Sequence, residues 1–286
     1  MIYGELYGIV NRHFTKLEEA SGKIDKELEK EAIHDFRTTY KKLRAWLRLL
    51  NFAIVMPAKI KIPKPGKEFY HSLGEIRDRQ IQCETILTKT QGHPVTPDEY
   101  FQVLKNEIGK FGDLSEKKEA RKSFVQEHKK IPSEVRESDR IIEAGKYLET
   151  KWDIVIGMVR ENQFEDEQLH TIRKILKDIY YITYKEDDTE TVPEENVYLD
   201  ENEFKNLLDD IGKFQDLCTA LELLCDDTIK KIKGKENRLL RKVRNILTED
   251  KITVKIEVID KLISLVNFVL MKREEEAIEQ AYAESI

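Results

Sequence analysis

The stretch IHDFRTTYKKLRAWLRLL, residues 33–50, repeats its apolar residues every three or four positions and predicts an amphipathic helix. On a wheel of 100° per residue, one histidine and four cations share an arc of about 80° opposite the large apolar side chains. A solvated face normally interleaves both signs of charge, because like charges one turn apart destabilise a helix. We therefore interpret this arc as an anion-binding face, with an ordinary solvated surface as the alternative. The cationic face comprises His34, Arg37, Lys41, Arg44 and Arg48, with Lys42 beside them.

The composition around this helix is that of a helix-rich protein. The 286 residues are 40% hydrophobic and 36% charged, with 12 glycines and 7 prolines. No apolar run approaches the roughly 20 residues that span a bilayer, and MIYGELYGIV does not resemble an export signal. Three scattered cysteines predict neither a disulfide framework nor a zinc site and favour a cytoplasmic location. The net charge of −6 argues against a simple basic nucleic-acid-binding protein.

Apolar residues recur at helical spacing along most of the chain, so the sequence predicts an all-α fold. The proline-rich stretch 57–66 and the Asp-, Glu- and Thr-rich stretch 186–199 are predicted loops. Asp25 and Thr96 are predicted helix caps. Helices are predicted near 2–20, 25–51, 67–89, 97–112, 115–130, 133–162, 165–185, 201–231, 236–247 and 254–283.

Two separate motifs recur at nearly the same distance along the chain. The pair His34 and Arg37 reappears as His170 and Arg173, and LGEIRD (73–78) reappears as IGKFQD (211–216). This coincidence indicates an internal duplication. It predicts one domain over 1–286, made of two four-helix bundles related by a pseudo-twofold axis. The repeats are predicted at about 25–162 and 163–283, after an N-terminal helix.

The second copy of the basic helix is less cationic than the first. Tyr180 and Tyr184 stand where Arg44 and Arg48 stand in the first copy. Arginine suits phosphate because its planar fork donates two hydrogen bonds at once, and lysine supplies a point charge. We expect the two polar faces to line one asymmetric groove between the bundles, with the first helix dominating affinity. The second face comprises His170, Arg173, Lys174, Lys177 and Tyr181.

These residues resemble the CHAD family, the conserved-histidine α-helical domains. The hallmarks of that family are a His-x-x-Arg helix rich in further Arg and Lys and a Leu-Gly-x-x-Arg-Asp segment, repeated in each half. The resemblance covers about residues 25–283, and Asp178, Tyr180 and Gln215 depart from the pattern in the second half. It implies two four-helix bundles around a basic cavity that binds inorganic polyphosphate, often in association with polyphosphate granules. It also brings Arg77 of LGEIRD into the predicted site.

Two further basic clusters are weaker candidates, and both are more typical of solvated helix faces. No cofactor or metal is predicted, and the prediction is binding without catalysis. The clusters are Arg121 with Lys122, and Arg238 with Arg241 and Lys242.

Three other functions stay open. RNA binding would use the same cations, with tyrosines stacking on bases. A phosphohydrolase or phosphotransferase would need phosphate-loop or metal-binding residues, and no G-x-x-x-x-G-K-[ST] motif is present, although His34 is a conceivable nucleophile. A di-metal carboxylate enzyme would use Glu-x-x-His pairs, but fixed positive charge around them repels a divalent cation. These pairs are Glu31 with His34, Glu68 with His71, and Glu167 with His170.

Overall fold

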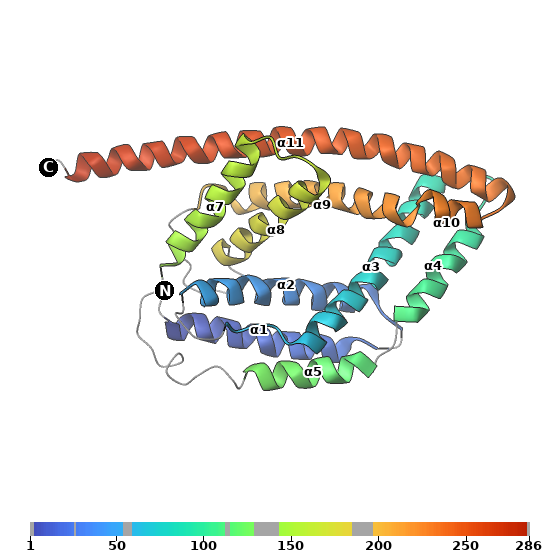
Figure 1. Cartoon of the computed structure of the whole chain (residues 1–286), viewed down its shortest axis with the longest axis horizontal. Coiled ribbons are helices and arrows are strands. Elements are labelled where there is room, and N and C mark those ends of the chain that lie inside the picture. Colours follow the sequence, from blue (N-terminus) through green and yellow to red (C-terminus); the bar gives the residue numbers. More distant parts are fainter. Residues whose placement is uncertain are drawn as a thin grey trace. The chain divides into compact units, whose positions relative to one another are not determined.

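The computed structural model describes residues 3–25, 27–53, 59–111, 115–128, 143–184 and 197–284. These residues form helices joined by turns, and they contain no strand (Figure 1). The all-α prediction is confirmed. None of the helices described carries an apolar stretch that could cross a bilayer.

Contacts divide the chain into two compact units. One unit comprises Met1–Glu143 with Asp216–Asp250, and the other comprises Ala144–Gln215 with Lys251–Ile286. The pseudo-twofold relation between predicted repeats stays a prediction. The helices are α1 (Tyr3–Lys23), α2 (Lys30–Ala53), α3 (Lys64–Thr90), α4 (Asp98–Phe111), α5 (Ser115–His128), α7 (Ala144–Arg160), α8 (Asp166–Thr183), α9 (Glu201–Leu223), α10 (Asp226–Lys231) and α11 (Gly234–Glu284).

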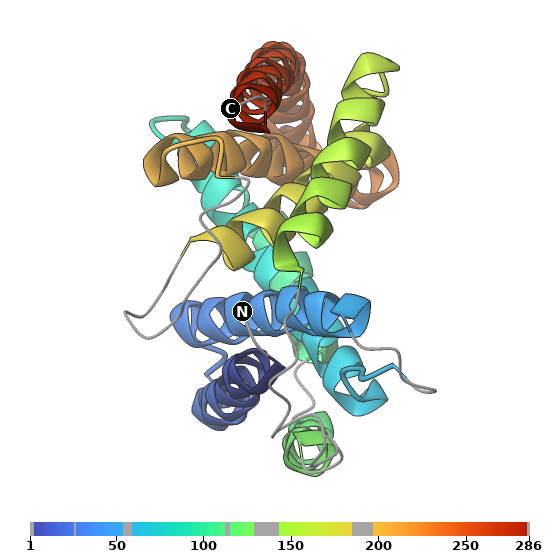
Figure 2. The same ribbon diagram turned by 90° about the vertical axis from the view of Figure 1, so that its left-hand side faces the viewer.

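In the first unit, α2 packs against α1 on one side and α3 on another. The two helices α1 and α2 run side by side in both ribbon views (Figures 1 and 2). Helix α3 also packs against α4 and α5. Helix α2 is therefore enclosed by neighbours along much of its circumference, and this leaves a narrow polar face.

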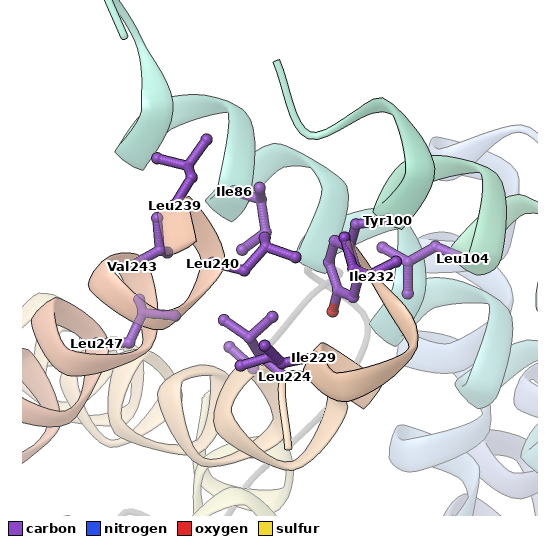
Figure 3. Close-up of a cluster of buried hydrophobic side chains, with 11 residues drawn as sticks. Ile86, Tyr100, Leu104, Leu224, Ile229, Ile232, Leu239, Leu240, Val243 and Leu247 are labelled. Carbon is purple, nitrogen blue, oxygen red and sulfur yellow. The ribbon is translucent and has the colours of Figure 1, made fainter. Parts of the chain in front are cut away.

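An apolar cluster of this unit joins α3 and α4 to the end of α9, to α10 and to the start of α11 (Figure 3). A buried amide is held within it, because Nε2 of Gln82 donates to the Tyr100 hydroxyl at 2.9 Å and to the Ala220 carbonyl at 3.3 Å. The cluster consists of Ile86, Tyr100, Leu104, Ala220, Leu224, Ile229, Ile232, Leu239, Leu240, Val243 and Leu247.

Helices α4 and α11 cap each other at their first turns. The buried Glu236 carboxylate accepts the backbone N–H groups of Glu99 at 3.1 Å and Tyr100 at 2.8 Å. In return, the Glu99 carboxylate accepts the N–H of Lys233 at 3.3 Å, just before α11 begins. Unpaired N–H groups at both helix starts are thus satisfied. The predicted cap Thr96 instead donates its hydroxyl to Asp98, so that prediction was wrong.

In the second unit, four basic residues attach α11 to the neighbouring helices. Lys251 and Lys255 pair with Asp166, the latter at 2.9 Å, at the start of α8. Lys261 pairs with Asp210 of α9 at 2.5 Å, and Arg273 pairs with Asp153 of α7 at 2.6 Å. Since these pairs alternate with buried residues such as Val258, Leu262 and Val269, one side of α11 is firmly held.

Three predicted helix boundaries were wrong. Helix α2 begins at Lys30, because Asp25 accepts the N–H of Glu27 in a turn and Leu28 has a positive φ of 52°. The predicted helices 236–247 and 254–283 are one helix of 51 residues, since the stretch between them contains no glycine or proline to break it. The predicted helix 201–231 breaks into α9 and α10 at Cys225, whose backbone is extended. Residues 133–142 of another predicted helix lie outside the described residues.

Candidate basic site

The cationic face of α2 lies between two buried flanks. Ala45 and Leu49 are buried on one flank. The large apolar side chains predicted opposite the cations are buried on the other: Ile33, Phe36, Tyr40, Leu43, Trp46, Leu47 and Leu50. The cations between them are therefore half-buried, whereas His34 at the start of the helix is exposed. Partial burial strengthens the interaction of such cations with an anion, because the local dielectric is lower than in water. The half-buried residues are Arg37, Lys41, Lys42, Arg44 and Arg48.

Arg37 is anchored on α3. Its Nη1 donates to the carbonyl of Tyr70 at 3.1 Å, and its guanidinium carbon lies 4.7 Å from the centre of the Tyr70 ring. A Cβ atom on Gly74 would lie 2.3 Å from the same Nη1. The arginine of the His-x-x-Arg motif thus rests on the glycine of the Leu-Gly motif, and the two motifs act as one contact.

Two stacked tyrosines continue this contact toward the rest of the face. The rings of Tyr40 and Tyr70 lie 4.0 Å apart and 16° from parallel. Burial raises the pKa of Tyr40 to about 12, although the nearby charges of Arg44 and Arg48 lower it. Tyr40 is therefore neutral at physiological pH, so it contributes no negative charge to the cationic face.

Arg44 carries a buried donor that is not satisfied within the described part of the chain. Its Nε has no hydrogen-bond partner there. A buried unsatisfied donor costs free energy, of the order of 1–3 kcal/mol. An anion at the cationic face would supply an acceptor if the Arg44 side chain turned toward it.

A half-buried carboxylate, that of Asp78, lies near Arg37. Burial raises the pKa of Asp78, the last residue of LGEIRD, and Glu75 and Asp216 raise it further, while Arg37 opposes the shift. Asp216 is the corresponding residue of IGKFQD, so the aspartates of the two motifs are electrostatic neighbours. Asp78 is the charge that faces Arg37 from α3.

Helix α8 repeats the arginine–glycine contact within the second unit. Nη2 of Arg173 lies 3.0 Å from the position that a Cβ on Gly212 would take. Asp178 is buried, and its carboxylate lies 3.9 Å from Nζ of Lys151. The apolar residues of the other face are buried as well: Leu169, Ile172, Ile175, Leu176, Ile179 and Ile182. A buried acid on this helix lowers the net positive charge near its polar face. Of the predicted face, His170, Arg173, Lys177 and Tyr181 are half-buried and Lys174 is exposed.

The two tyrosines that replace arginine in the second copy are Tyr180 in α8 and Tyr184 just after it. Both contact α9 or the residues directly before it. The Tyr180 hydroxyl donates to Glu201 at 3.1 Å, and the Tyr184 hydroxyl donates to the Leu199 carbonyl at 2.6 Å. Both rings meet the Phe204 ring edge-on, with centres 5.8 Å apart. These contacts give both tyrosines a packing role.

The weaker basic clusters differ in their surroundings. Arg121 pairs with Glu18 at 3.2 Å, and Arg241 pairs with Asp226 at 3.6 Å. Lys122, Arg238 and Lys242 are exposed. Ion pairs of this kind, between exposed arginines and carboxylates, are typical of solvated helix faces. Arg77, which the resemblance adds to the site, is half-buried in α3.

Sequence reasoning missed three residues that build the site. Tyr70 carries Arg37, and Gly74 makes room for it. Arg79 is buried and pairs with Glu75 of its own helix at 2.7 Å. It also pairs with Glu107 of α4 at 2.8 Å and so joins α3 to α4. The glycine in each Leu-Gly or Ile-Gly motif was the available signal, since a helix interior disfavours glycine unless space is needed.

The Glu-x-x-His pairs are the ligands that a di-metal site would use. Within the described ranges, no group of three or more His, Cys, Asp or Glu residues is arranged to hold a metal ion.

Comparison with known proteins identifies the family. The crystal structure of the CHAD domain from the plant Ricinus communis matches with a TM-score of 0.57 at 13% sequence identity, over 93% of this chain and 92% of that chain. At this identity the likeness shows the fold alone. None of the curated proteins matches. The family model of the CHAD domain matches residues 8–225, which is more than half of the sequence. The chain therefore belongs to the CHAD domain family.

Proposed function

We propose that this protein binds inorganic polyphosphate without turning it over, chiefly through the cationic face of α2. The observation that carries the proposal is the buried, unsatisfied Nε of Arg44 within a row of half-buried cations. A planar guanidinium fits a phosphate oxygen well, and the Nε of Arg44 gains a partner when the side chain turns toward such a ligand.

The length of the row favours a linear ligand. From His34 to Arg48 the helix rises about 21 Å at 1.5 Å per residue, so the cations are spread over about four turns. A single phosphate would contact only a part of this row, whereas a chain of phosphates would meet donors along all of it. Membership of the CHAD family supports the same ligand.

RNA is the main alternative ligand. The described tyrosines of α8 argue against base stacking there, because Tyr180 and Tyr184 pack against Phe204 and donate their hydroxyls internally. A ligand bound through phosphate alone needs no stacking partner.

We place the protein in the cytoplasm, in association with polyphosphate granules.

The decisive experiment is fluorescence anisotropy with labelled polyphosphate and with single-stranded RNA of equal charge, across a salt series. Binding to polyphosphate should be the tighter of the two and should weaken steeply with salt. The double variant Arg44→Gln/Arg48→Gln should lose at least about tenfold in affinity, since each charged hydrogen bond contributes about 1.5–3 kcal/mol.

The charge-matched control is Arg160→Gln/Lys205→Gln, which changes two exposed residues outside the predicted faces. It should keep wild-type affinity. Equal losses in both double variants, or tighter binding of RNA, would refute the proposal. Release of phosphate from polyphosphate, with or without magnesium, would show that the protein is an enzyme.

A further inference from the structure

The outward side of α11 in the second unit carries a stripe of exposed apolar residues. Their exposed fractions run from 38% to 72%, although large apolar side chains of a soluble protein are mostly buried. On a helical wheel they share an arc of about 120°. We call these residues the α11 stripe: Ile252, Ile256, Ile263, Met271, Ile278 and Tyr282.

The stripe is symmetric about Asn267. Ile263 and Met271 lie four residues from Asn267 on either side, Ile256 and Ile278 lie eleven, and Ile252 and Tyr282 lie fifteen. A surface with this symmetry is complementary to itself when two copies run antiparallel. Each member of the stripe then comes level with its counterpart on the other copy.

The last turns of α11 carry exposed side chains only, among the residues described. Every side chain described from Glu274 to Ala283 is exposed, including those of Ile278 and Tyr282. Most helical stability in proteins comes from packing of an apolar face. A second helix laid against the stripe would supply that packing.

From these observations we propose that α11 pairs with α11 of a second copy, antiparallel and centred on Asn267. The six side chains present roughly 600–700 Å² per copy, against about 800 Å² per partner in a typical stable interface. Asn267 lies at the centre, where the two amides face each other. A single polar residue at the seam of a helix pair fixes its register.

Two carboxylates lie within the α11 stripe and weaken the proposed pairing. Asp260 and Glu274 each lie seven residues from Asn267, within the same arc. In the antiparallel register, Asp260 comes level with Glu274 of the second copy, and the like charges repel. The pairing is therefore weaker than its apolar area alone implies, and its register can be tested by charge reversal.

Sedimentation velocity of the full chain from about 1 to 100 µM tests the pairing, since this range covers the weak affinities of interfaces somewhat below the standard size. Wild type should dimerise, and Ile256→Glu or Ile278→Glu should each raise the dissociation constant at least tenfold, because each buries a charge. Ile154→Glu is the matched control, since Ile154 is 44% exposed and belongs to α7, not to the α11 stripe. A wild type that stays monomeric, or a dimer that Ile256→Glu leaves intact, overturns the proposal.

Two further measurements test the register. Asp260→Lys should tighten the dimer about tenfold by creating two ion pairs with Glu274, and adding Glu274→Lys should reverse that gain. Asn267→Cys should form a disulfide-linked dimer on mild oxidation, while Thr253→Cys should not, because its two copies would lie about 40 Å apart. Cross-linking by both variants would indicate a parallel pair and overturn the antiparallel register.

Discussion

Arg37 of α2 rests directly on Gly74 of α3, so closely that a Cβ atom at Gly74 would lie 2.3 Å from its Nη1. The guanidinium then reaches over the Tyr70 ring and donates to the Tyr70 carbonyl. The His-x-x-Arg motif of α2 and the Leu-Gly motif of α3 therefore contact each other through Arg37 and Gly74. The arginine of the His-x-x-Arg motif has a structural role, whatever it contributes to binding an anion.

Substitution of Gly74 tests this contact. In Gly74→Ala, the new methyl group should displace the Arg37 guanidinium and break its hydrogen bond and ring contact, at a cost of about 1–2 kcal/mol. Gly212→Ala should cost less, because the corresponding distance to Arg173 is 3.0 Å. Thermal unfolding followed by circular dichroism measures both effects.

Gly157→Ala is the control for that series. Gly157 lies inside α7 with open space around its Cβ position, so alanine there should raise stability by about 0.5–1 kcal/mol. If Gly74→Ala proved as harmless as Gly157→Ala, Arg37 would not be anchored by this contact.

Arg79 should matter to stability far more than its neighbour Arg77. Arg79→Ala leaves Glu75 and Glu107 without their partner and removes the link from α3 to α4, which should cost about 2–4 kcal/mol. Arg77→Ala should cost less than about 1 kcal/mol. Chemical denaturation compares the two, and a similar loss in both variants would contradict the assignment of Arg79 as a structural residue.

Asp78 provides a test by pH. Because burial raises its folded pKa above the unfolded value, the ionised carboxylate destabilises the folded state at neutral pH. Asp78→Asn should therefore be more stable than wild type at pH 7. The difference should shrink as the pH falls through the raised pKa and vanish below the ordinary aspartate range, near pH 3.9. A variant that is less stable than wild type at pH 7 would show that the attraction to Arg37 dominates.

The two basic helices should contribute unequally to polyphosphate affinity. Lys174→Gln/Lys177→Gln on α8 removes two charges and should cost about threefold or less, whereas Lys41→Gln/Arg48→Gln on α2 should cost about tenfold or more. The physical reason is that α8 carries tyrosines in two arginine positions and a buried acid, Asp178. Anisotropy at one fixed salt concentration measures both, and equal losses would point to a symmetric site.

The sequence alone predicted the helical class and the buried and polar faces of α2 and α8, and it showed that the two motifs recur together. These follow from a 3.6-residue period, because side chains at that spacing must share a face whatever the helix packs against. The family followed from the same residues. The continuity of α11 was harder to predict, since the few apolar residues between 247 and 254 weakened the pattern although nothing there breaks a helix.

Only the tertiary structure decided how those faces are used. The fit of Arg37 on Gly74, the ring of Tyr70 beneath it and the paired capping of α4 by Glu236 join residues far apart in the chain. Likewise, the sequence motif points to Arg77, but it is Arg79 that pairs with Glu107 of α4. Periodicity fixes the side of a helix on which a residue lies, whereas the distance to another helix, and hence the energy of the contact, depends on how the helices pack.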